Sequence, residues 1–310
     1  MHIERVPGIA LSPSGAVAAY LGDWARVAPA YEYDWRRQES FERRAAYLTG
    51  GGYAGDRAAV AAALERYNRA LGADEAALDN ARLLGRPETL AAVTGQQAGI
   101  LTGPAYSIYK AMTTIRLARQ QSQRLGVPVV PVFWIAGEDH DWHEVSWVMV
   151  PAGNETRRLA LSERFDGERR SVALAPMPAS VSDLIDEFAQ LMPDTEFKEE
   201  VIARLREAAA GGPALDPEAT GGAPSLADWF GRLMAWVFRG TGLVFLNSSD
   251  PALRRIEAPF FARALQQQAE VEAACAAGVD RWERELGFAC TVAQTPNSLN
   301  LFIYIDGERL

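Results

Sequence analysis

The first ninety residues carry the apolar spacing that is typical of helices. Apolar side chains recur every three or four positions among charged ones over residues 33–48 and 56–71, as in a helix with one buried face. A run of three glycines, residues 50–52, separates these stretches, and residues 74–84 form a candidate third helix. Because no catalytic cluster occurs here, the pattern predicts that residues 1–88 form a helical segment packing on the core.

The pattern then changes to one that indicates a parallel sheet. Residues 90–94 and 127–136 are apolar runs without alternation, and a helical pattern over residues 104–125 lies between them. Strands buried on both faces have this composition, and the strand-helix-strand order implies a right-handed parallel crossover. Since Pro128 and Pro131 cannot donate to a ladder, we expect a bulge or an edge position near the start of the second strand.

The next residues predict a segment of mixed structure and then a return to the sheet. Residues 148–179 alternate apolar and polar positions with turn signals, as β-rich structure does, and residues 182–210 have the pattern of one or two amphipathic helices. A Gly-, Pro- and Ala-rich loop precedes a helix over residues 226–238. Residues 242–247 form a third buried strand, and residues 251–286 form one long helix or two in succession.

The end of the sequence indicates a hairpin. Residues 291–306 have a strand pattern, Asp306-Gly307 is a turn signal, and residues 308–310 begin a returning strand. Because a chain that stops inside a hairpin leaves an unpaired edge, we expect the N-terminal portion of a longer protein. The predicted fold class is therefore α/β. We expect an N-terminal helical segment over residues 1–88, an inserted α+β segment over residues 148–238, and a core in two parts, residues 89–147 and 239–310.

The composition is that of a globular protein with a full core. Hydrophobic residues make up 48% of the 310 residues and charged residues 23%, which excludes global disorder. The net charge of −9 argues against nucleic acid and membrane surfaces as partners. The longest apolar stretch, residues 127–137, is shorter than the roughly 18 residues that cross a bilayer, and residues 1–24 lack a signal-peptide pattern. We expect a cytoplasmic protein.

The first polar loop follows the first predicted strand and reads T-G-Q-Q-A-G-I-L-T-G-P, residues 94–104. Its glycines recur every four residues, unlike a dinucleotide fingerprint or a Walker A loop. Pro104 suits the first position of a helix, whose N-terminus favours an anion, and Thr102 or Gly103 could cap it. The sequence is equally consistent with a tight turn and with an anion-binding site at this loop. The candidate residues here are Gly95, Gln96, Gln97, Gly99, Thr102, Gly103, Tyr106 and Lys110.

The second polar loop, G-E-D-H-D-W-H-E at residues 137–144, concentrates carboxylates and two of the three histidines directly after a buried strand. Ligands of open parallel sheets bind beyond the carboxyl ends of the strands. The cluster could hold a metal ion or perform acid–base chemistry, and at least one of its carboxylates could cap the following helix. The candidate residues are Trp134, Glu138, Asp139, His140, Asp141 and His143.

The third polar loop follows the third strand and reads N-S-S-D-P, with Asn247, Ser248, Ser249 and Asp250 as candidates. Capping of the helix that starts at Pro251 is the favoured role, but the loop also lies at the mouth of the same expected crevice. No G-x-S-x-G elbow is present, so nothing supports a serine hydrolase. Two cysteines, Cys275 and Cys290, are too few for a disulfide framework or a four-cysteine zinc site, and we interpret them as small buried hydrophobes.

Together these segments resemble a known family. Residues 94–110, residues 127–141 and the sequence L-N-S-S-D-P at 246–251 are similar, in this order, to the bacillithiol biosynthesis cysteine-adding enzyme family, and the resemblance covers essentially the whole chain. It implies a Rossmann-like core with inserted segments, related in architecture to class I aminoacyl-tRNA synthetases. It also implies that family members continue into further sheet and a helical coiled coil used for homodimerisation, a region that we expect to lie beyond this N-terminal portion.

The resemblance also implies a reaction, the joining of cysteine to the amino group of glucosaminyl malate in the last step of bacillithiol synthesis. The expected route activates the carboxylate with ATP or another nucleotide and Mg²⁺. The loop at residues 95–103 would then hold phosphate or carboxylate, and Lys110 would neutralise developing charge. His140 with Asp139 or Asp141 would move the amine proton or order Mg²⁺.

Two other functions remain open from the residues alone. One is a metal-dependent hydrolase that uses Asp139, His140, Asp141 and His143, and the other is a non-catalytic module that binds small molecules. All three hypotheses require the polar loops to share one pocket, so Gln97, His140 and Ser249 should lie on one surface.

Overall fold

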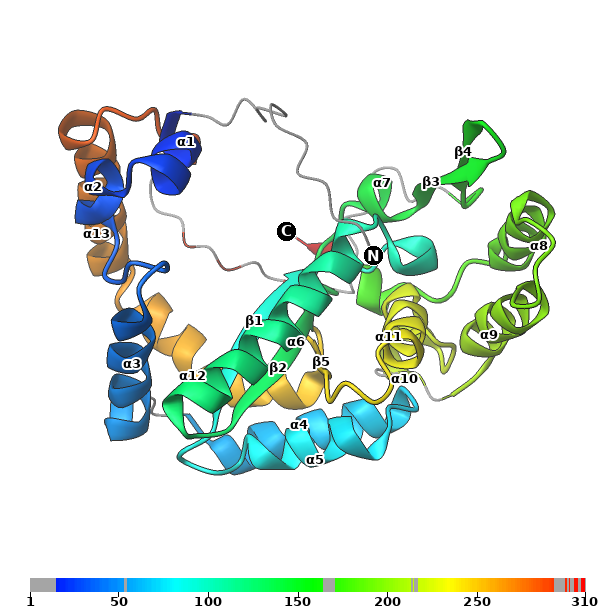
Figure 1. The fold of residues 1–310 in the computed structure, drawn as a ribbon, viewed down its shortest axis with the longest axis horizontal. Helices are drawn as coiled ribbons and strands as arrows, with labels where there is room; N and C mark the ends of the chain where they lie inside the picture. The colour runs from blue at the N-terminus through cyan, green and yellow to red at the C-terminus, as the bar shows by residue number, and fades with distance from the viewer. Residues whose placement is uncertain are drawn as a thin grey trace. The chain divides into compact units, whose positions relative to one another are not determined.

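The computed structural model describes residues 15–52, 55–163, 171–212, 214, 217–292, 299, 301, 304–305 and 308–309 (Figure 1). By packing, the chain divides into two units, one of residues 1–47 and 259–301 and one of residues 48–258 and 302–310. The second unit contains the sheet and all three polar loops. None of the helices in the described ranges is both long and apolar enough to cross a membrane.

Three strands of the described chain form the parallel sheet, β1 (Leu90–Gln96), β2 (Val129–Ile135) and β5 (Val244–Asn247), in the order β1-β2-β5. Gln96 pairs with Ile135 and Ile135 pairs with Asn247, so the three carboxyl ends lie at one edge. The expected α/β class and the parallel pairing are confirmed.

The expectation of an edge position near the start of the second strand is confirmed: β2 is the central strand of the three, but among the described strands its residues 129–131 pair with β1 alone. The Pro128 carbonyl accepts a hydrogen bond from the β1 side, and the Ile135 carbonyl accepts one from the β5 side. Because the backbone groups of successive strand residues alternate between the two sides, those of Pro131 face the β5 side. Pairing with β5 begins one residue later, at Val132. The missing N–H of Pro131 therefore falls where β5 has not yet started, and the ladder loses no bond.

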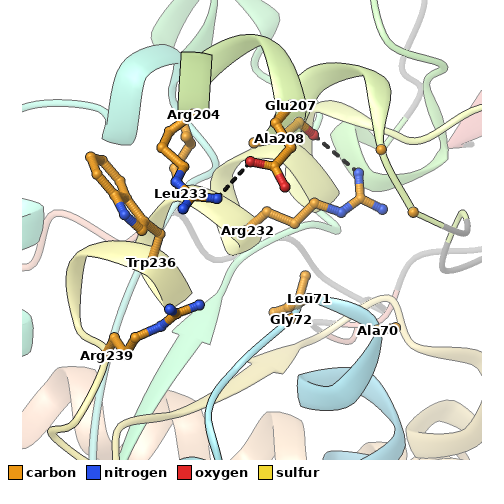
Figure 2. A pocket seen from close by; sticks show the side chains of 12 residues that line it. Ala70, Leu71, Gly72, Arg204, Glu207, Ala208, Arg232, Leu233, Trp236 and Arg239 are labelled. Atoms are coloured by element: carbon orange, nitrogen blue, oxygen red, sulfur yellow. Dashed lines mark hydrogen bonds and ion pairs between the residues drawn. The ribbon is translucent and has the colours of Figure 1, made fainter. Parts of the chain in front are cut away.

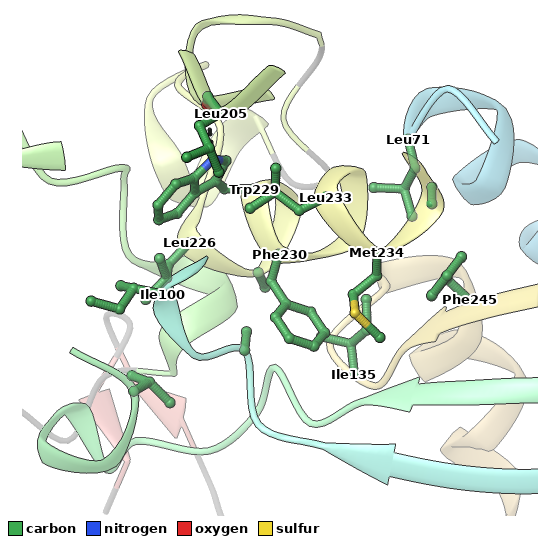
Figure 3. Close-up of a cluster of buried hydrophobic side chains, with 14 of the residues drawn as sticks. Leu71, Ile100, Ile135, Leu205, Leu226, Trp229, Phe230, Leu233, Met234 and Phe245 are labelled. Carbon is green, nitrogen blue, oxygen red and sulfur yellow. Dashed lines mark hydrogen bonds between the residues drawn. The ribbon is translucent and has the colours of Figure 1, made fainter. Parts of the chain in front are cut away.

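Helices cover both faces of the sheet. On one face, α6 (Tyr106–Leu125) and α11 (Leu226–Val237) pack against Phe133 and Ile135. Figure 3 shows Phe230 and Met234 of α11 beside Ile135. On the other face, α4 (Arg57–Ala70), α5 (Glu75–Leu83) and the first turns of α12 (Pro251–Gln266) pack against Val130, Val132 and Val244. Burial on both sides explains why β2 and β5 are apolar without alternation, whereas Ala91 and Val93 of β1 are exposed, so the expectation of burial on both faces is wrong for β1.

The outer edge of β5 is closed by a side chain. The fully buried Asn68 of α4 donates from Nδ2 to the Phe245 carbonyl at 2.8 Å and accepts from the Phe245 amide at 2.9 Å. One amide thus makes the two bonds that a further strand would make there. This bond pair also ties α4 to β5, whose end carries the third polar loop.

The segment between β2 and β5 combines a hairpin with helices. α7 (Trp142–Val145) leads to β3 (Trp147–Ala152), which pairs antiparallel with β4 (Glu155–Ala160), and the expectation of β-rich structure is confirmed for this hairpin. Further along, residues 172–174 form the 3₁₀ helix η4 instead of a strand, and residues 164–170 lie outside the described ones. The helices that follow are α8 (Val181–Leu191), α9 (Lys198–Ala210) and the short α10 (Pro217–Thr220) before α11.

The described part of the other unit consists mainly of helices. It contains α1 (Gly15–Gly22), α2 (Trp24–Val27), η1 (Ala28–Ala30), α3 (Gln38–Tyr47), α13 (Gln268–Asp280) and η5 (Arg281–Glu285). The helix expected from residue 33 begins only at Gln38, because the Asp34 carboxylate binds the amide and guanidinium of Arg36 in a local turn. The long helix over residues 251–286 is interrupted at Gln267.

The expected terminal hairpin is confirmed in part. β6 (Tyr304–Ile305) pairs antiparallel with β7 (Glu308–Arg309), while the turn residues Asp306 and Gly307 lie outside the described residues. Thr291 and Val292 are not in a strand, and most of the remaining strand expected up to residue 306 is not described. Neither cysteine is buried in the described structure, so the interpretation as buried hydrophobes is wrong; Cys275 is exposed and Cys290 half-buried.

Candidate functional site

The loops after β1, β2 and β5 leave the sheet side by side. The Ala136 amide donates to the Gln96 carbonyl at 3.0 Å, and the Ser248 amide and hydroxyl both donate to the Ile135 carbonyl at 3.2 Å. These bonds continue the ladder past the last paired residues. We call the polar groups of the three loops the strand-end site.

Two glutamines join the first loop to the second. Gln97 Nε2 donates to Asp139 Oδ2 at 2.8 Å and also to the Glu144 carboxylate, and two protons allow one amide nitrogen to bind both acids. Gln96 Nε2 donates to Gln97 Oε1 at 2.9 Å, and Lys110 Nζ donates to Gln96 Oε1 at 2.9 Å. A continuous row of hydrogen bonds therefore runs from the cation of α6 to the carboxylates beyond β2.

Lys110 is held at the end of β1. Its Nζ also donates to the Gly95 carbonyl at 3.0 Å and lies 5.4 Å from the centre of the Tyr106 ring. The Tyr106 hydroxyl accepts from Gln96 Nε2 at 3.3 Å. The lysine that the sequence singled out thus lies at the edge where ligands of parallel sheets bind.

The acidic loop places one histidine beside a carboxylate. His140 Nδ1 lies 3.6 Å from Asp139 Oδ1, and both side chains are about two-thirds buried (30% and 31% exposed). The Asp141 amide donates to Asp139 Oδ1 at 3.1 Å, so both oxygens of Asp139 have donors. Asp141 and His143 are exposed to solvent. Of these four residues, Asp139 and His140 are therefore the ones that the fold orients.

Glu138 lies half-buried on the inner side of the same loop. Burial raises the pKa of its carboxyl above the usual range, while the nearby positive charge of Arg254 opposes the rise and Asp139 and Glu257 add to it. A carboxyl in these surroundings holds its proton to higher pH than a solvated one.

A segment that the sequence did not single out fastens the second loop to the third. The Gly137 carbonyl accepts from the Ala173 amide at 2.9 Å and from the Ser171 hydroxyl, and Ser171 Oγ lies 3.4 Å from Ser249 Oγ. Ser171 lies 34 residues from Gly137 and 78 from Ser249, so no sequence spacing relates them. Glu144, the partner of Gln97, lies within the acidic cluster, but its position in the sequence does not distinguish it as a candidate.

The residues of the third loop mainly build the fold. Asp250 is buried, and its carboxylate accepts from Arg66 Nη2 at 2.8 Å and from the Ala252 amide at 2.8 Å, which is the capping role favoured by the sequence. Asn247 Oδ1 accepts from the Ser249 amide at 3.0 Å, and Ser248 binds the Ile135 carbonyl. The side chain of Ser249 is therefore the best candidate in this loop for contacting a ligand.

The glycine loop has a conformation of its own. Leu101, Thr102 and Gly103 all have positive φ values, of 52°, 74° and 70°, and α6 begins only at Tyr106. The expected caps at Thr102 or Gly103 and the helix start at Pro104 are wrong, because this left-handed turn delays the helix. A Cβ on Gly99 would lie 2.9 Å from Gly103 Cα, so the turn closes only with glycine there.

Trp134 lies away from the polar loops, on the face of the sheet that α4 covers. With Val93 and Leu246 it lines an apolar cavity of about 260 Å³. Gly95 permits this arrangement, because a Cβ there would lie 2.6 Å from the Trp134 carbonyl oxygen.

The hydrolase hypothesis finds no support. Within the ranges that the structure describes, no three His, Cys, Asp or Glu side chains are grouped so that they could hold a metal ion. His143 points to solvent while Asp139 is bound by Gln97, so the expected four-residue cluster does not converge.

The sequence was compared with known proteins. The family model described as Bacillithiol biosynthesis BshC, N-terminal Rossmann-like domain, matches residues 1–310. A protein of Symbiobacterium thermophilum named "Putative cysteine ligase BshC" is 98% identical over 310 residues, which are all of this chain and 56% of that protein. Proteins of the same name from Geobacillus thermodenitrificans and Shouchella clausii are 36% and 34% identical, over 100% and 96% of this chain and 54% and 52% of their own lengths.

The chain thus spans about half the length of the curated relatives it matches. The family model confirms the Rossmann-like core that the resemblance implied, and the relatives' shared name gives no support to a hydrolase or a non-catalytic module. The chain belongs to the family of the BshC N-terminal Rossmann-like domain of bacillithiol biosynthesis.

Proposed function

We propose that this chain supplies the reacting site of a cysteine ligase, which joins cysteine to the amino group of glucosaminyl malate in the last step of bacillithiol biosynthesis. The observation that carries the proposal is the hydrogen-bonded row Lys110–Gln96–Gln97–Asp139, with His140 beside its end, at the carboxyl ends of a parallel sheet. The relatives' name specifies cysteine and ligation.

Each part of the row has a task in forming an amide bond. His140, oriented beside Asp139, accepts the proton that the sugar amine loses as it attacks the carboxyl carbon of cysteine. Lys110 supplies a fixed positive charge against the negative charge that develops on the carboxyl oxygen. The two glutamines hold these groups in register, because their amides bind both ends of the row.

We further propose ATP or another nucleotide with Mg²⁺ as the activating group, which would make the carboxyl oxygen of cysteine a leaving group. The chain offers Lys110 and the amide donors of the first turn of α6 for its phosphates, and that turn carries no side-chain cap. Asp141, which is exposed to solvent, would be the carboxylate for Mg²⁺, which is commonly held by one or two carboxylates together with phosphates.

A product assay with matched variants tests the proposal. The chain and the Symbiobacterium relative are each incubated with cysteine, glucosaminyl malate and ATP–Mg²⁺, and thiol products are measured by mass spectrometry. Binding of each compound is measured by calorimetry. His140→Ala should slow product formation by about 10²-fold or more, as expected for loss of a general base.

Lys110→Met should slow product formation about 10²-fold, and the chain provides a matched control in its other lysine. Lys198 lies on α9, where Nζ donates to the Met192 carbonyl at 3.4 Å, so Lys198→Met should leave the rate unchanged. Near-normal rates in both the His140 and the Lys110 variants would remove the assigned roles. Absence of substrate binding by the chain and of product from both proteins would remove the proposed function.

A further inference from the structure

The first turn of α6 buries a hydroxyl group that has no hydrogen-bond partner. Ser107, the second residue of the helix, is fully buried, and its Oγ makes no hydrogen bond with any described residue. A buried hydroxyl without a partner costs free energy, because it has given up its hydrogen bonds to water. Such groups are rare in folded proteins, and each one needs a physical explanation.

The hydroxyl of Ser107 faces the glycine turn in front of the helix. Helical side chains lean towards the N-terminus of their helix, and a Cβ on Gly103 would lie 3.4 Å from Ser107 Oγ. Gly103 has φ of 70° and ψ of −160°, a conformation that essentially only glycine adopts, so position 103 brings no side chain over the hydroxyl. Residues 104–106 are exposed, so solvent reaches this end of α6. A ligand at this end therefore reaches the hydroxyl through a movement of the turn at Gly103 alone.

Other hydrogen-bond donors lie at the same end of the helix. The amides of Tyr106 and Ile108, in the first turn of α6, make no hydrogen bond with any described residue. Free amides at a helix N-terminus attract anions, because they carry the positive end of the helix dipole. Lys110 lies one turn further along α6, where its ammonium group donates to the Gly95 carbonyl at 3.0 Å. Donors and a positive charge together match the oxygens of an anion.

A second group of cations lies elsewhere in the same unit and already faces acids of the fold. The guanidinium groups of Arg204, Arg232 and Arg239 line a cavity of about 300 Å³ between α4, α9 and α11 (Figure 2). Arg204 Nη1 donates to Glu207 Oε2 at 2.7 Å, and Arg232 lies near the negative charge of Asp228. The charges of this cavity therefore select no ligand by themselves, and the exposed Arg239 serves below as a control cation.

We propose that Ser107 Oγ is a ligand contact of the strand-end site, where it donates to an oxygen of a phosphate or carboxylate group at the N-terminus of α6. The inference rests on the proposed function for the source of that oxygen, which is either the phosphates of a nucleotide or the carboxylate of cysteine. A hydrogen bond to an anion provides the partner that the buried hydroxyl lacks within the chain. Lys110 supplies the charge, while the hydroxyl and the helix amides fix the direction of the oxygen.

The test is calorimetric titration of the parent and of Ser107→Ala with pyrophosphate and with cysteine. Loss of one hydrogen bond to a charged group should weaken the binding of the recognised probe by about tenfold or more. Cysteamine, which is cysteine without its carboxylate, shows whether binding of cysteine depends on that group. Because the hydroxyl has no partner in the chain, Ser107→Ala should unfold at the same denaturant concentration as the parent or at a higher one.

Ser122→Ala is the matched control, with the same chemical change on the same helix. Ser122 Oγ accepts from the Val129 amide at 2.7 Å, so its loss should lower the unfolding midpoint and leave the binding of both probes unchanged. Arg239→Ala removes a cation outside the strand-end site and should also bind both probes as the parent does. A role for Ser107 in packing alone predicts the opposite pattern, a lower midpoint with unchanged binding.

Weaker binding of pyrophosphate by Ser107→Ala would identify a phosphate ligand, and weaker binding of cysteine but not of cysteamine a carboxylate ligand. The proposal is overturned if neither probe binds saturably at millimolar concentration, if Ser107→Ala binds both probes as Ser122→Ala does, or if its midpoint falls as far as that of Ser122→Ala. Loss of binding in Arg239→Ala with parent binding in Ser107→Ala would also overturn it.

This inference and the proposed function fail separately. Probe binding that depends on Ser107, in a chain and a Symbiobacterium relative that form no thiol product, would keep the contact and remove the ligase function. Product formation by Ser107→Ala with the kcat and KM of the parent would keep the ligase function and remove the contact.

Discussion

Replacing Gly137 by alanine should push apart the loops that form the strand-end site. Gly137 lies two residues after the end of β2, and its carbonyl accepts from the Ala173 amide and the Ser171 hydroxyl. A Cβ at this position would lie 2.8 Å from the Ala173 Cβ and closer still to Asn247 Oδ1. The added methyl group would therefore press on the third loop and on the segment that fastens it.

The size of the effect follows from these distances. Carbon atoms pack at about 3.5–4.0 Å, so the 2.8 Å contact must open by about 1 Å. Asn247 is fully buried and its Oδ1 binds the Ser249 amide, so it cannot turn away without losing that bond. Such overpacking costs about 1–3 kcal/mol of unfolding free energy, and a misplacement of about 1 Å can slow catalysis about 10²-fold.

Chemical denaturation followed by tryptophan fluorescence measures the loss, and Gly50→Ala provides a control with the same chemical change. A Cβ on Gly50 would meet nothing within 4 Å, so that variant should keep or slightly raise the stability, by about 0.4–1 kcal/mol at most. The product assay is run on the same variants. If Gly137→Ala unfolds at the same denaturant concentration as Gly50→Ala and forms product at the parent rate, the argument that this glycine sets the spacing of the loops is wrong.

Three further changes test other parts of the fold. Asn68→Ala leaves the buried N–H and carbonyl of Phe245 without partners and should lower the unfolding free energy by about 2–5 kcal/mol in denaturant titrations. Asp250→Ala removes the acceptor of Arg66 and the cap of α12, and thermal unfolding should reveal a loss of about 1–2 kcal/mol. The pKa of Glu138 is raised in the fold, so the unfolding free energy of the parent falls as the pH rises above the ordinary carboxyl pKa of 4.5. Glu138→Gln should therefore be more stable than the parent at neutral pH, but not below pH 4.5. Equal unfolding midpoints of the two proteins throughout a pH series would refute this.

Local patterns in the sequence determined the elements of the core and their pairing direction. Continuous apolar runs marked β1, β2 and β5; a strand covered on both faces has no polar side, which explains the runs of β2 and β5 but not that of β1, where Val93 is exposed. Helical spacing marked α4, α5, α6 and α11, since one buried face repeats every three or four residues. Parallel pairing then placed the loops after each strand at one edge, which is why Lys110, Gln97 and Asp139 could be named as candidates together.

Only the tertiary structure decided which polar groups meet. Gln97 bridges Asp139 and Glu144, and Ser171 fastens Gly137 to the third loop, through contacts that span tens of residues and leave no periodic signal in the sequence. Pro131 fits a central strand because β5 starts one residue later, which depends on register. Periodicity reports which face of an element is buried, but the packing of elements determines what that face contacts.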